Sequence, residues 1–222
     1  MSWSWEHLQK SLAEYLKEDA SDDQRGRKRR RIVAAATDLF LQYGYRKTSI
    51  SDVARRAGTA KGTIYLYFSS KAELLMHAVA MEKAANIHAM TPITEEGISD
   101  QERLRRYVRL ALLMTQQMPL ATMLISGDRE IFSAMDEIDE DFRSYTERMQ
   151  LEFFRNLLAP FAACHCWSDE DLEHRVWALS SFVMAGPTLM DARVRHGIDD
   201  ERWADVLTDM VVVGIGDLRG GT

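Results

Sequence analysis

The chain of 222 residues has little cysteine, little proline and no long apolar run. No stretch approaches the ~18 consecutive apolar residues of a membrane-spanning helix, and the first ten residues, MSWSWEHLQK, are polar and amphipathic. We therefore expect neither secretion nor insertion into a membrane, and we expect a cytoplasmic location.

The two cysteines do not form a convincing site for a metal or for catalysis. Cys164 and Cys166 are separated only by His165, which strains a direct disulfide and fits a reducing compartment. Zinc sites usually have cysteines two to four residues apart and further ligands elsewhere, and the sequence has no second pair and no HExxH motif. GTAKGT also lacks the GxxxxGK[ST] spacing of a phosphate loop. We expect no metal, no cofactor and no enzyme activity.

The net charge of −6 is unevenly distributed along the chain. Residues 25–78 contain 12 Lys or Arg against 3 Asp or Glu, a net charge of +9, whereas residues 79–222 contain 14 against 25, a net charge of −11. Such a separation attracts a polyanion to one part of the molecule and repels it from the other. The sequence therefore predicts a basic module and an acidic module.

Apolar residues recur at steps of three and four along nearly every segment, and no alternating strand pattern is present. We therefore expect an all-α fold. Helix one is expected to follow the basic cluster Arg25 to Arg31 and to end at Gly44. Its inward face should be Ile32, Ala35, Ala36, Leu39, Phe40 and Tyr43. Further helices are expected at about residues 50–57, 61–68, 70–90 and 128–158. Another short helix should follow Pro119. Three more should begin at Ser99, at Ser168 and at Asp199 or Asp200.

Residues 50–71, ISDVARRAGTAKGTIYLYFSSK, have the pattern of two short helices that meet at a tight turn. Ala54 supplies a small residue where the helices touch, Gly58 supplies backbone freedom at the turn, and Ile64 packs the second helix onto the first. Thr48 or Ser49 is a plausible N-cap of the first helix. This pattern is typical of a helix-turn-helix.

The stretch AGTAKGTIYLYFSSKAELL resembles AGVSKGTLYHYFKSKEEL, a usual sequence of TetR-type bacterial transcriptional regulators. Phe40 and Gly44 in DLFLQYGYRKTSI match the preceding helix of that family, so the resemblance covers roughly residues 28–78. Thr59, Ala60 and Leu66 depart from the family's usual Val, Ser and His, so the resemblance implies no particular operator sequence. The resemblance implies a three-helix DNA-binding domain followed by a helical domain for ligand binding and dimerisation.

We expect the second helix to enter the major groove, with Lys61, Thr63 and Tyr65 at or near base edges. Tyr67 and Lys71 can hold backbone oxygens, and Thr48 with the amides that begin helix two can hold another phosphate. We expect Leu66 either to pack against the protein or to touch a thymine methyl group. For the tyrosines the alternative is that they cover the small core, for which Ile64 and Phe68 are better candidates.

Two basic or polar segments precede this region. The cluster that contains Arg29 and Arg30 is either a solvated run or an arm that reaches phosphates or the minor groove. Residues 1–24 should form an extension with a short amphipathic helix whose apolar stripe is Trp5, Leu8, Leu12 and Leu16. That helix is either frayed, or packed on the DNA-binding module or a partner subunit. The predicted domains are therefore residues 1–24, 25–78 and 79–222.

One reading helix covers few base pairs, so we expect a homodimer on a pseudo-palindromic operator in double-stranded DNA. The last two helices have wide apolar stripes that suit a two-fold interface, as the resemblance also implies, although they also suit ordinary core.

The acidic module is rich in methionine and aromatic residues, which suit an adaptable apolar cavity, although most will be core. Its candidate pocket residues are Met114, Met118, Met123, Phe132, Met135, Phe142, Tyr145, Trp177 and Met184. The resemblance implies a repressor released by a small apolar or amphipathic effector, with no membrane partner. The alternative is a DNA-binding regulator whose acidic module docks another protein.

Overall fold

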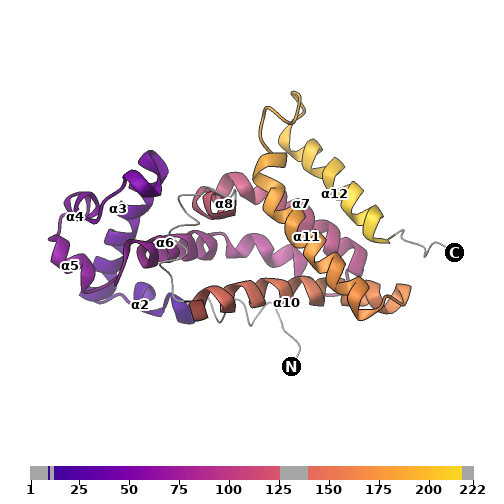
Figure 1. The fold of residues 1–222 in the computed structure, drawn as a ribbon, viewed down its shortest axis with the longest axis horizontal. Helices are drawn as coiled ribbons and strands as arrows, with labels where there is room; N and C mark the ends of the chain where they lie inside the picture. Colours follow the sequence, from indigo (N-terminus) through magenta and orange to yellow (C-terminus); the bar gives the residue numbers. More distant parts are fainter. Residues whose placement is uncertain (1–9, 11–12, 126–139, 217–222) are drawn as a thin grey trace. The chain divides into compact units, whose positions relative to one another are not determined.

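The computed structural model describes residues 10, 13–125 and 140–216, and all the regular structure in these ranges is helical (Figure 1). The all-α expectation is confirmed. These residues form two compact units. The N-terminal unit comprises the described residues up to 86 together with 118–125 and 140–143, and the C-terminal unit comprises 87–117 and 144–216. The sequence-based division after residue 78 stays a prediction.

The N-terminal unit is built around α3 (Gln24–Lys47), which packs on α2 (Lys17–Ala20), α4 (Ile50–Arg56), α6 (Lys71–Ala85) and α8 (Pro119–Ile125). The short helix α5 (Lys61–Tyr65) packs on α4. The largest fully buried side chains of this core are Phe40, Phe68, Ile32, Ile64, Leu74, Leu75 and Leu120. The predicted core positions Ile64 and Phe68 are therefore confirmed.

The break predicted at Gly44 lies inside α3, where Gly44 has φ +81° and ψ 165°. The prediction that Tyr43 faces the core is wrong, since its side chain is 53% exposed. Tyr45 takes that place at 6% exposed, with its ring 5.7 Å from the ring of Phe40. The positive φ of Gly44 turns the chain, so Tyr45, which follows it, enters the core outside the helical spacing of the residues before Gly44.

Serine side chains cap the helices that follow. Ser49 rather than Thr48 caps α4, accepting from Asp52 N at 3.1 Å, and Ser70 caps α6, accepting from Glu73 N at 3.0 Å. The helix expected over residues 70–90 ends at Ala85, which corrects that prediction. The side chain of Asn86 donates to Glu82 O at 2.9 Å, and a 3₁₀ helix, η1 (Ile87–Ile93), follows.

In the C-terminal unit, α7 (Asp100–Gln117) packs on η1, α11 (Asp169–Leu189) and α12 (Asp200–Gly216). Arg109 and Gln116 of α7 bind Asp205 and Asp200 at 2.7 Å and 2.6 Å, and Arg105 pairs with Asp209. The core side chains include Leu104, Val108, Leu112, Phe154, Leu158, Val176 and Ala204.

The other helices of this unit begin and end close to where the sequence indicates. Ser168 caps α11, as predicted, and it forms a reciprocal capping box with Asp171. The helix expected over residues 128–158 corresponds to α10 (Glu140–His165). Its expected start lies in residues 126–139, outside the described part of the chain. It continues past Leu158 to bury Phe161 in the core.

The segment after α7 returns to the N-terminal unit. The carboxylate of Glu82 on α6 accepts from the amides of Leu120 and Ala121 at 3.1 Å and 2.8 Å, and both residues are buried in the same core as Phe40. The α8 helix thereby completes the core of a unit whose other helices all precede it by more than thirty residues.

Two glycines of the helix-turn-helix provide a matched stability test. Gly58 has φ +60°, whereas Gly62 lies within α5 with open space where a Cβ would stand. We expect Gly58→Ala to lower the free energy of unfolding by about 1–2 kcal/mol, because an L side chain is strained there. Gly62→Ala should leave it unchanged or raise it by about 0.5–1 kcal/mol. Urea unfolding followed by circular dichroism measures both, and equal effects would contradict the assigned turn.

Candidate nucleic-acid interface

The turn between α4 and α5 fixes the direction of α5. The amide of Gly58 donates to Arg55 O at 3.2 Å, and the amide of Thr59 donates to Ala54 O at 2.9 Å, which closes the end of α4. The Ile64 side chain is completely buried, so the opposite face of α5 points to solvent. This is the geometry that the spacing of Ala54, Gly58 and Ile64 predicts.

The outward face of α5 carries the side chains that the sequence indicates for DNA contact. Lys61 is exposed, Tyr65 is 49% exposed, and Thr63 is half-buried. Leu66 is 76% exposed and does not pack in this structure, which leaves an apolar group open to solvent beside Tyr65. An ammonium, a hydroxyl, a phenol and an isolated apolar side chain match the donors, acceptors and methyl groups of a major groove.

Tyr67 lies just after α5 and is partly buried against the core. The guanidinium carbon of Arg25 lies 5.7 Å from the centre of its ring, and Arg29 Nη1 donates to its carbonyl oxygen at 3.0 Å. Tyr67 thus joins the reading helix to the start of α3.

The basic cluster of residues 25–31 does not form a separate arm, because it makes the first turns of α3. Asp23 caps this helix and accepts from Gly26 N at 2.6 Å, a bond that lowers the pKa of the Asp23 carboxyl. Arg29 is only 4% exposed. Arg30 donates to Ser21 O at 2.7 Å. Both arginines bind inside the module here, so their contact with DNA stays a prediction.

Thr48 and Lys71 are likewise engaged within the module. Thr48 is buried, and its hydroxyl donates to Gly44 O at 2.9 Å. The ammonium of Lys71 donates to Tyr45 O at 2.9 Å and to Thr48 O at 3.1 Å, and it lies 4.0 Å from the centre of the Tyr45 ring. These bonds hold the turn between α3 and α4, and direct DNA contact by either side chain stays a prediction.

The sequence interpretation overlooked a basic hollow beside the turn between α3 and α4. Its volume is about 500 Å³, and its lining residues are Leu39, Tyr43, Lys47, Thr48, Asp52, Arg55 and Arg56. Arg55 pairs with Asp52 at 2.6 Å, and a hydrogen bond from Ser49 lowers the pKa of the Asp52 carboxyl. The hollow could have been suspected from the basic residues that end both helices.

The described candidate pocket residues are divided between the two units. Met118 and Met123 pack against the core of the N-terminal unit, Met114 is buried, and Trp177 and Met184 are exposed. Phe132 and Met135 lie outside the described residues, as do the side chains of Phe142 and Tyr145.

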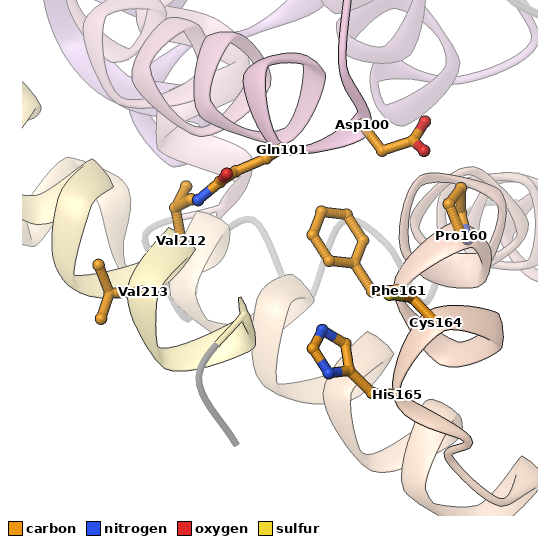
Figure 2. A pocket seen from close by; sticks show the side chains of 8 residues that line it. All are labelled: Asp100, Gln101, Pro160, Phe161, Cys164, His165, Val212 and Val213. Carbon is orange, nitrogen blue, oxygen red and sulfur yellow. The ribbon is translucent and has the colours of Figure 1, made fainter. Parts of the chain in front are cut away.

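The C-terminal unit contains a different cavity, of about 520 Å³ (Figure 2). Figure 2 shows the ring of Phe161 at its centre, with the imidazole of His165 beside it. Its lining residues are Asp100, Gln101, Pro160, Phe161, Cys164, His165, Val212 and Val213, and none of them is a predicted pocket residue.

Cys164 and Cys166 are free and exposed. The ring of His165 between them stacks on the ring of Trp167, with 5.8 Å between centres. Within the ranges that the structure describes, no three His, Cys, Asp or Glu residues come together in a way that could hold a metal ion. No helix in the same ranges is long and apolar enough to span a bilayer.

The last two helices leave apolar side chains on the surface of the C-terminal unit. Trp177 and Met184 of α11 are separated by seven residues and so lie on one face of that helix. The exposed apolar residues of α12 are Val206, Met210 and Val213, again on one face. Large exposed apolar side chains in such rows mark contact surfaces.

Residues 32–78 match the family model of the bacterial regulatory proteins of the tetR family. The helix-turn-helix region is of the TetR type. The match covers the helix-turn-helix together with most of α3 and the first half of α6. The match includes α5, whose outward face is the candidate surface for DNA contact.

Three relatives extend this result. The fatty acid metabolism regulator protein of Bacillus subtilis (strain 168) is 30% identical over 100 residues, which cover 45% of this chain and 46% of that protein. RutR of Escherichia coli (strain K12) is 29% identical over 119 residues, 53% of this chain and 56% of that protein. The chain thus spans about half the length of these two relatives. FadR from Bacillus subtilis in complex with stearoyl-CoA shares the fold, with a TM-score of 0.61 and 18% identity over 83% of this chain and 98% of that one.

Removal of the side-chain charge should have different effects at Lys71 and at Lys61. We expect Lys71→Met to lower the free energy of unfolding by about 1–3 kcal/mol, because two backbone carbonyls lose a donor. Lys61→Met, on the exposed face of α5, should leave stability unchanged and weaken binding to duplex DNA. Thermal unfolding and fluorescence anisotropy measure the two effects. Unchanged stability of Lys71→Met would refute its structural role.

Proposed function

We propose that the protein is a sequence-specific, double-stranded DNA-binding transcriptional regulator that acts as a homodimer and, most simply, as a cytoplasmic repressor. The observation that carries the proposal is α5, which buries Ile64 and presents Lys61 and Tyr65 to solvent. The TetR-type module around α5 has a net charge of +9 over residues 25–78, which supplies attraction for phosphates.

The reading contacts are assigned to the outward face of α5. Lys61, Thr63 and Tyr65 take base edges, and Leu66 takes a thymine methyl. Tyr67 holds a backbone phosphate and sets the register of the helix in the groove. Thr48 and Lys71 act indirectly, because they fix the turn that presents the amides at the start of α4 to another phosphate.

The exposed apolar rows of α11 and α12 support the homodimer. Burial of these rows across a two-fold axis would join four helices and place two reading helices on one duplex. The operator is then a pseudo-palindrome whose half-sites lie about 34 Å, one turn of DNA, or a multiple of it apart.

The C-terminal unit is proposed to respond to a small apolar or amphipathic effector. The support is the match to the tetR family model together with the stearoyl-CoA of FadR, a relative in fold. The second candidate, docking of another protein on the C-terminal unit, is favoured by the exposed Trp177 and Met210. Loss of operator binding on addition of acyl-CoA or similar compounds, with thermal stabilisation of the protein, distinguishes the first from the second.

Selection of bound sequences from random duplexes tests the DNA-binding function. We expect one pseudo-palindromic sequence to be enriched and to be bound far more tightly than random duplex at moderate salt. If no sequence is enriched at any salt concentration, the proposed function is wrong.

Two exposed side chains of the same unit test the contact assignment. Tyr65→Ala should reduce the preference for the selected operator by about 1–3 kcal/mol, the size of one lost base contact. Leu41→Ala, at an exposed position on α3 that does not line the basic hollow, should leave the preference as it is in the parent. Competition binding against random duplex measures both, and equal preferences in the two variants would show that α5 does not read bases through Tyr65.

Two exposed apolar residues test the dimer surface. Met210→Glu places a charge at the centre of the α12 row and should raise the dimer dissociation constant at least about 100-fold, because an unpaired buried charge costs about 3–5 kcal/mol. Leu41→Glu, an exposed apolar position on α3, should have no effect. Sedimentation velocity over a range of concentrations gives the constants. Unaltered association of Met210→Glu would place the interface elsewhere.

A further inference from the structure

We propose that Glu18, in the segment before α3, is a positioning residue for operator recognition: through Arg29 and Arg25 it holds Tyr67 and, with it, the end of the reading helix. This inference rests on the proposed DNA-binding function. It concerns a part of the chain that lies before the residues matched by the TetR family model, which begin at residue 32.

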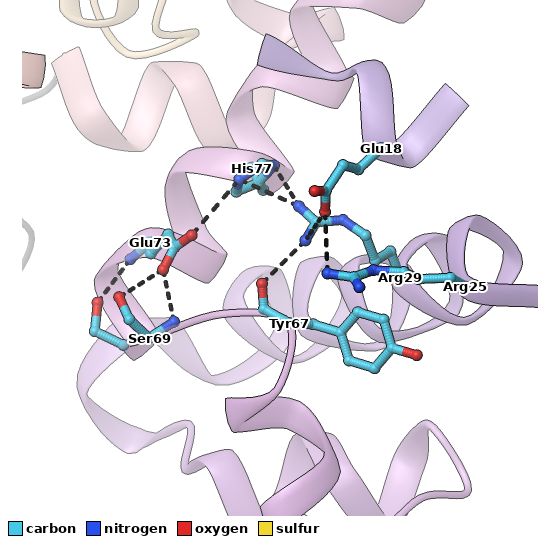
Figure 3. Close-up of polar contacts among 8 residues, drawn as sticks. Glu18, Arg25, Arg29, Tyr67, Ser69, Glu73 and His77 are labelled. Carbon is cyan, nitrogen blue, oxygen red and sulfur yellow. Dashed lines mark hydrogen bonds and ion pairs between the residues drawn. The ribbon is translucent and has the colours of Figure 1, made fainter. Parts of the chain in front are cut away.

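The carboxylate of Glu18 lies between two arginines of α3 (Figure 3). It is 3.1 Å from Arg29 Nη1 and 3.7 Å from Arg25 Nη2. The side chain of Arg29 is almost completely buried, whereas those of Glu18 and Arg25 are more than half exposed. One surface carboxylate therefore balances both a buried and an exposed positive charge.

Both arginines lead directly to Tyr67. The same Arg29 Nη1 that faces Glu18 donates to Tyr67 O at 3.0 Å, and the guanidinium of Arg25 lies over the Tyr67 ring. Figure 3 shows the carbonyl of Tyr67 joined to Arg29 and the ring of Tyr67 beside the guanidinium of Arg25. The backbone and the side chain of the residue that ends the reading surface are thus held from the same carboxylate.

The buried position of Arg29 explains what the carboxylate contributes. The guanidinium carbon of Arg29 lies 4.5 Å from the centre of the Phe68 ring, and Nη2 lies 3.4 Å from Nε2 of His77. A nearby negative charge lowers the free-energy cost of keeping a positive charge in such surroundings. Removal of the Glu18 charge therefore weakens the hold on this guanidinium and, through it, the bond to Tyr67 O.

The segment that carries Glu18 is fixed on the module by further contacts. The ring of Tyr15 stacks on His77, with centres 4.5 Å apart, and Leu16 is buried. A Cβ at Gly26 would overlap the carbonyl of Ser21, so the turn between α2 and α3 lies directly against the helix. The extension expected over residues 1–24 thus packs on the DNA-binding module in its described part.

The test compares Glu18→Gln with Glu14→Gln. Glu14 lies in the same segment and pairs with Lys17 at 3.3 Å, with both side chains 73% exposed, so its replacement removes the same charge without touching α3. For Glu18→Gln we expect the preference for the selected operator over random duplex to fall roughly tenfold, as for one lost base contact. Its affinity for random duplex should not fall. Glu14→Gln should keep the preference within about twofold of the parent.

A measurement on the free protein separates positioning from DNA binding. The chain has seven tyrosines, and 3-fluorotyrosine labelling with Tyr67→Phe as the reference assigns the fluorine resonance of Tyr67. Glu18→Gln should shift or broaden that resonance, Glu14→Gln should not, and Glu18→Asp should restore part of the parent spectrum.

The outcomes are distinct. If the parent protein shows no preference for any duplex sequence, the proposed function is wrong. The fluorine spectra then still decide whether Glu18 positions Tyr67. Equal loss of preference in the two glutamine variants points to a general charge effect and overturns the inference. A lower melting temperature of Glu18→Gln with parallel loss of binding to all duplexes assigns Glu18 a purely structural role and also overturns it.

Discussion

Burial of Ile64 and Phe68 is the constraint on which the proposed DNA-reading surface depends. The reading helix α5 has five residues, far fewer than a helix needs to be stable alone in water. Its shape therefore comes from two side chains that enter the core of the N-terminal unit on either side of Tyr65 and Leu66. Because these anchors are completely buried, the outward direction of Lys61 and Tyr65 follows from packing inside the module.

The basic module uses its positive charges for two purposes. Lys61 remains on the surface, where it can meet phosphates, whereas Arg29 and Lys71 bind backbone carbonyls and aromatic rings inside the fold. The net charge of +9 over residues 25–78 therefore overstates the charge that faces a polyanion. The internal cations instead fix the two ends of the helix-turn-helix, at Thr48 before α4 and at Tyr67 after α5.

The sequence was sufficient where local chemistry decides the structure. Ser70 and Ser168 cap helices as expected, Gly58 makes the turn, and Ile64 is buried, because each role depends on near neighbours in the chain. The sequence was insufficient where contacts between residues far apart in the chain decide the structure. Helical spacing predicted that Tyr43 faces the core, but Tyr45 occupies that place. No pattern in the sequence shows that Arg29 binds the carbonyl oxygen of Tyr67 or that Lys71 binds the carbonyl oxygen of Tyr45. Side-chain type alone also did not indicate the division into units, since the candidate pocket residues Met118 and Trp177 belong to different units.

The bond between Glu82 and the start of α8 has a consequence for how the protein is divided. Leu120 and Ala121 belong to the same core as Phe40, although more than thirty residues of the other unit separate them from α6. A truncated polypeptide that stopped after α6 would expose the apolar surface that Leu120 covers and would leave the Glu82 carboxylate without its two amides. An autonomous DNA-binding fragment must therefore carry α8 as well, joined to α6 by a short artificial connection.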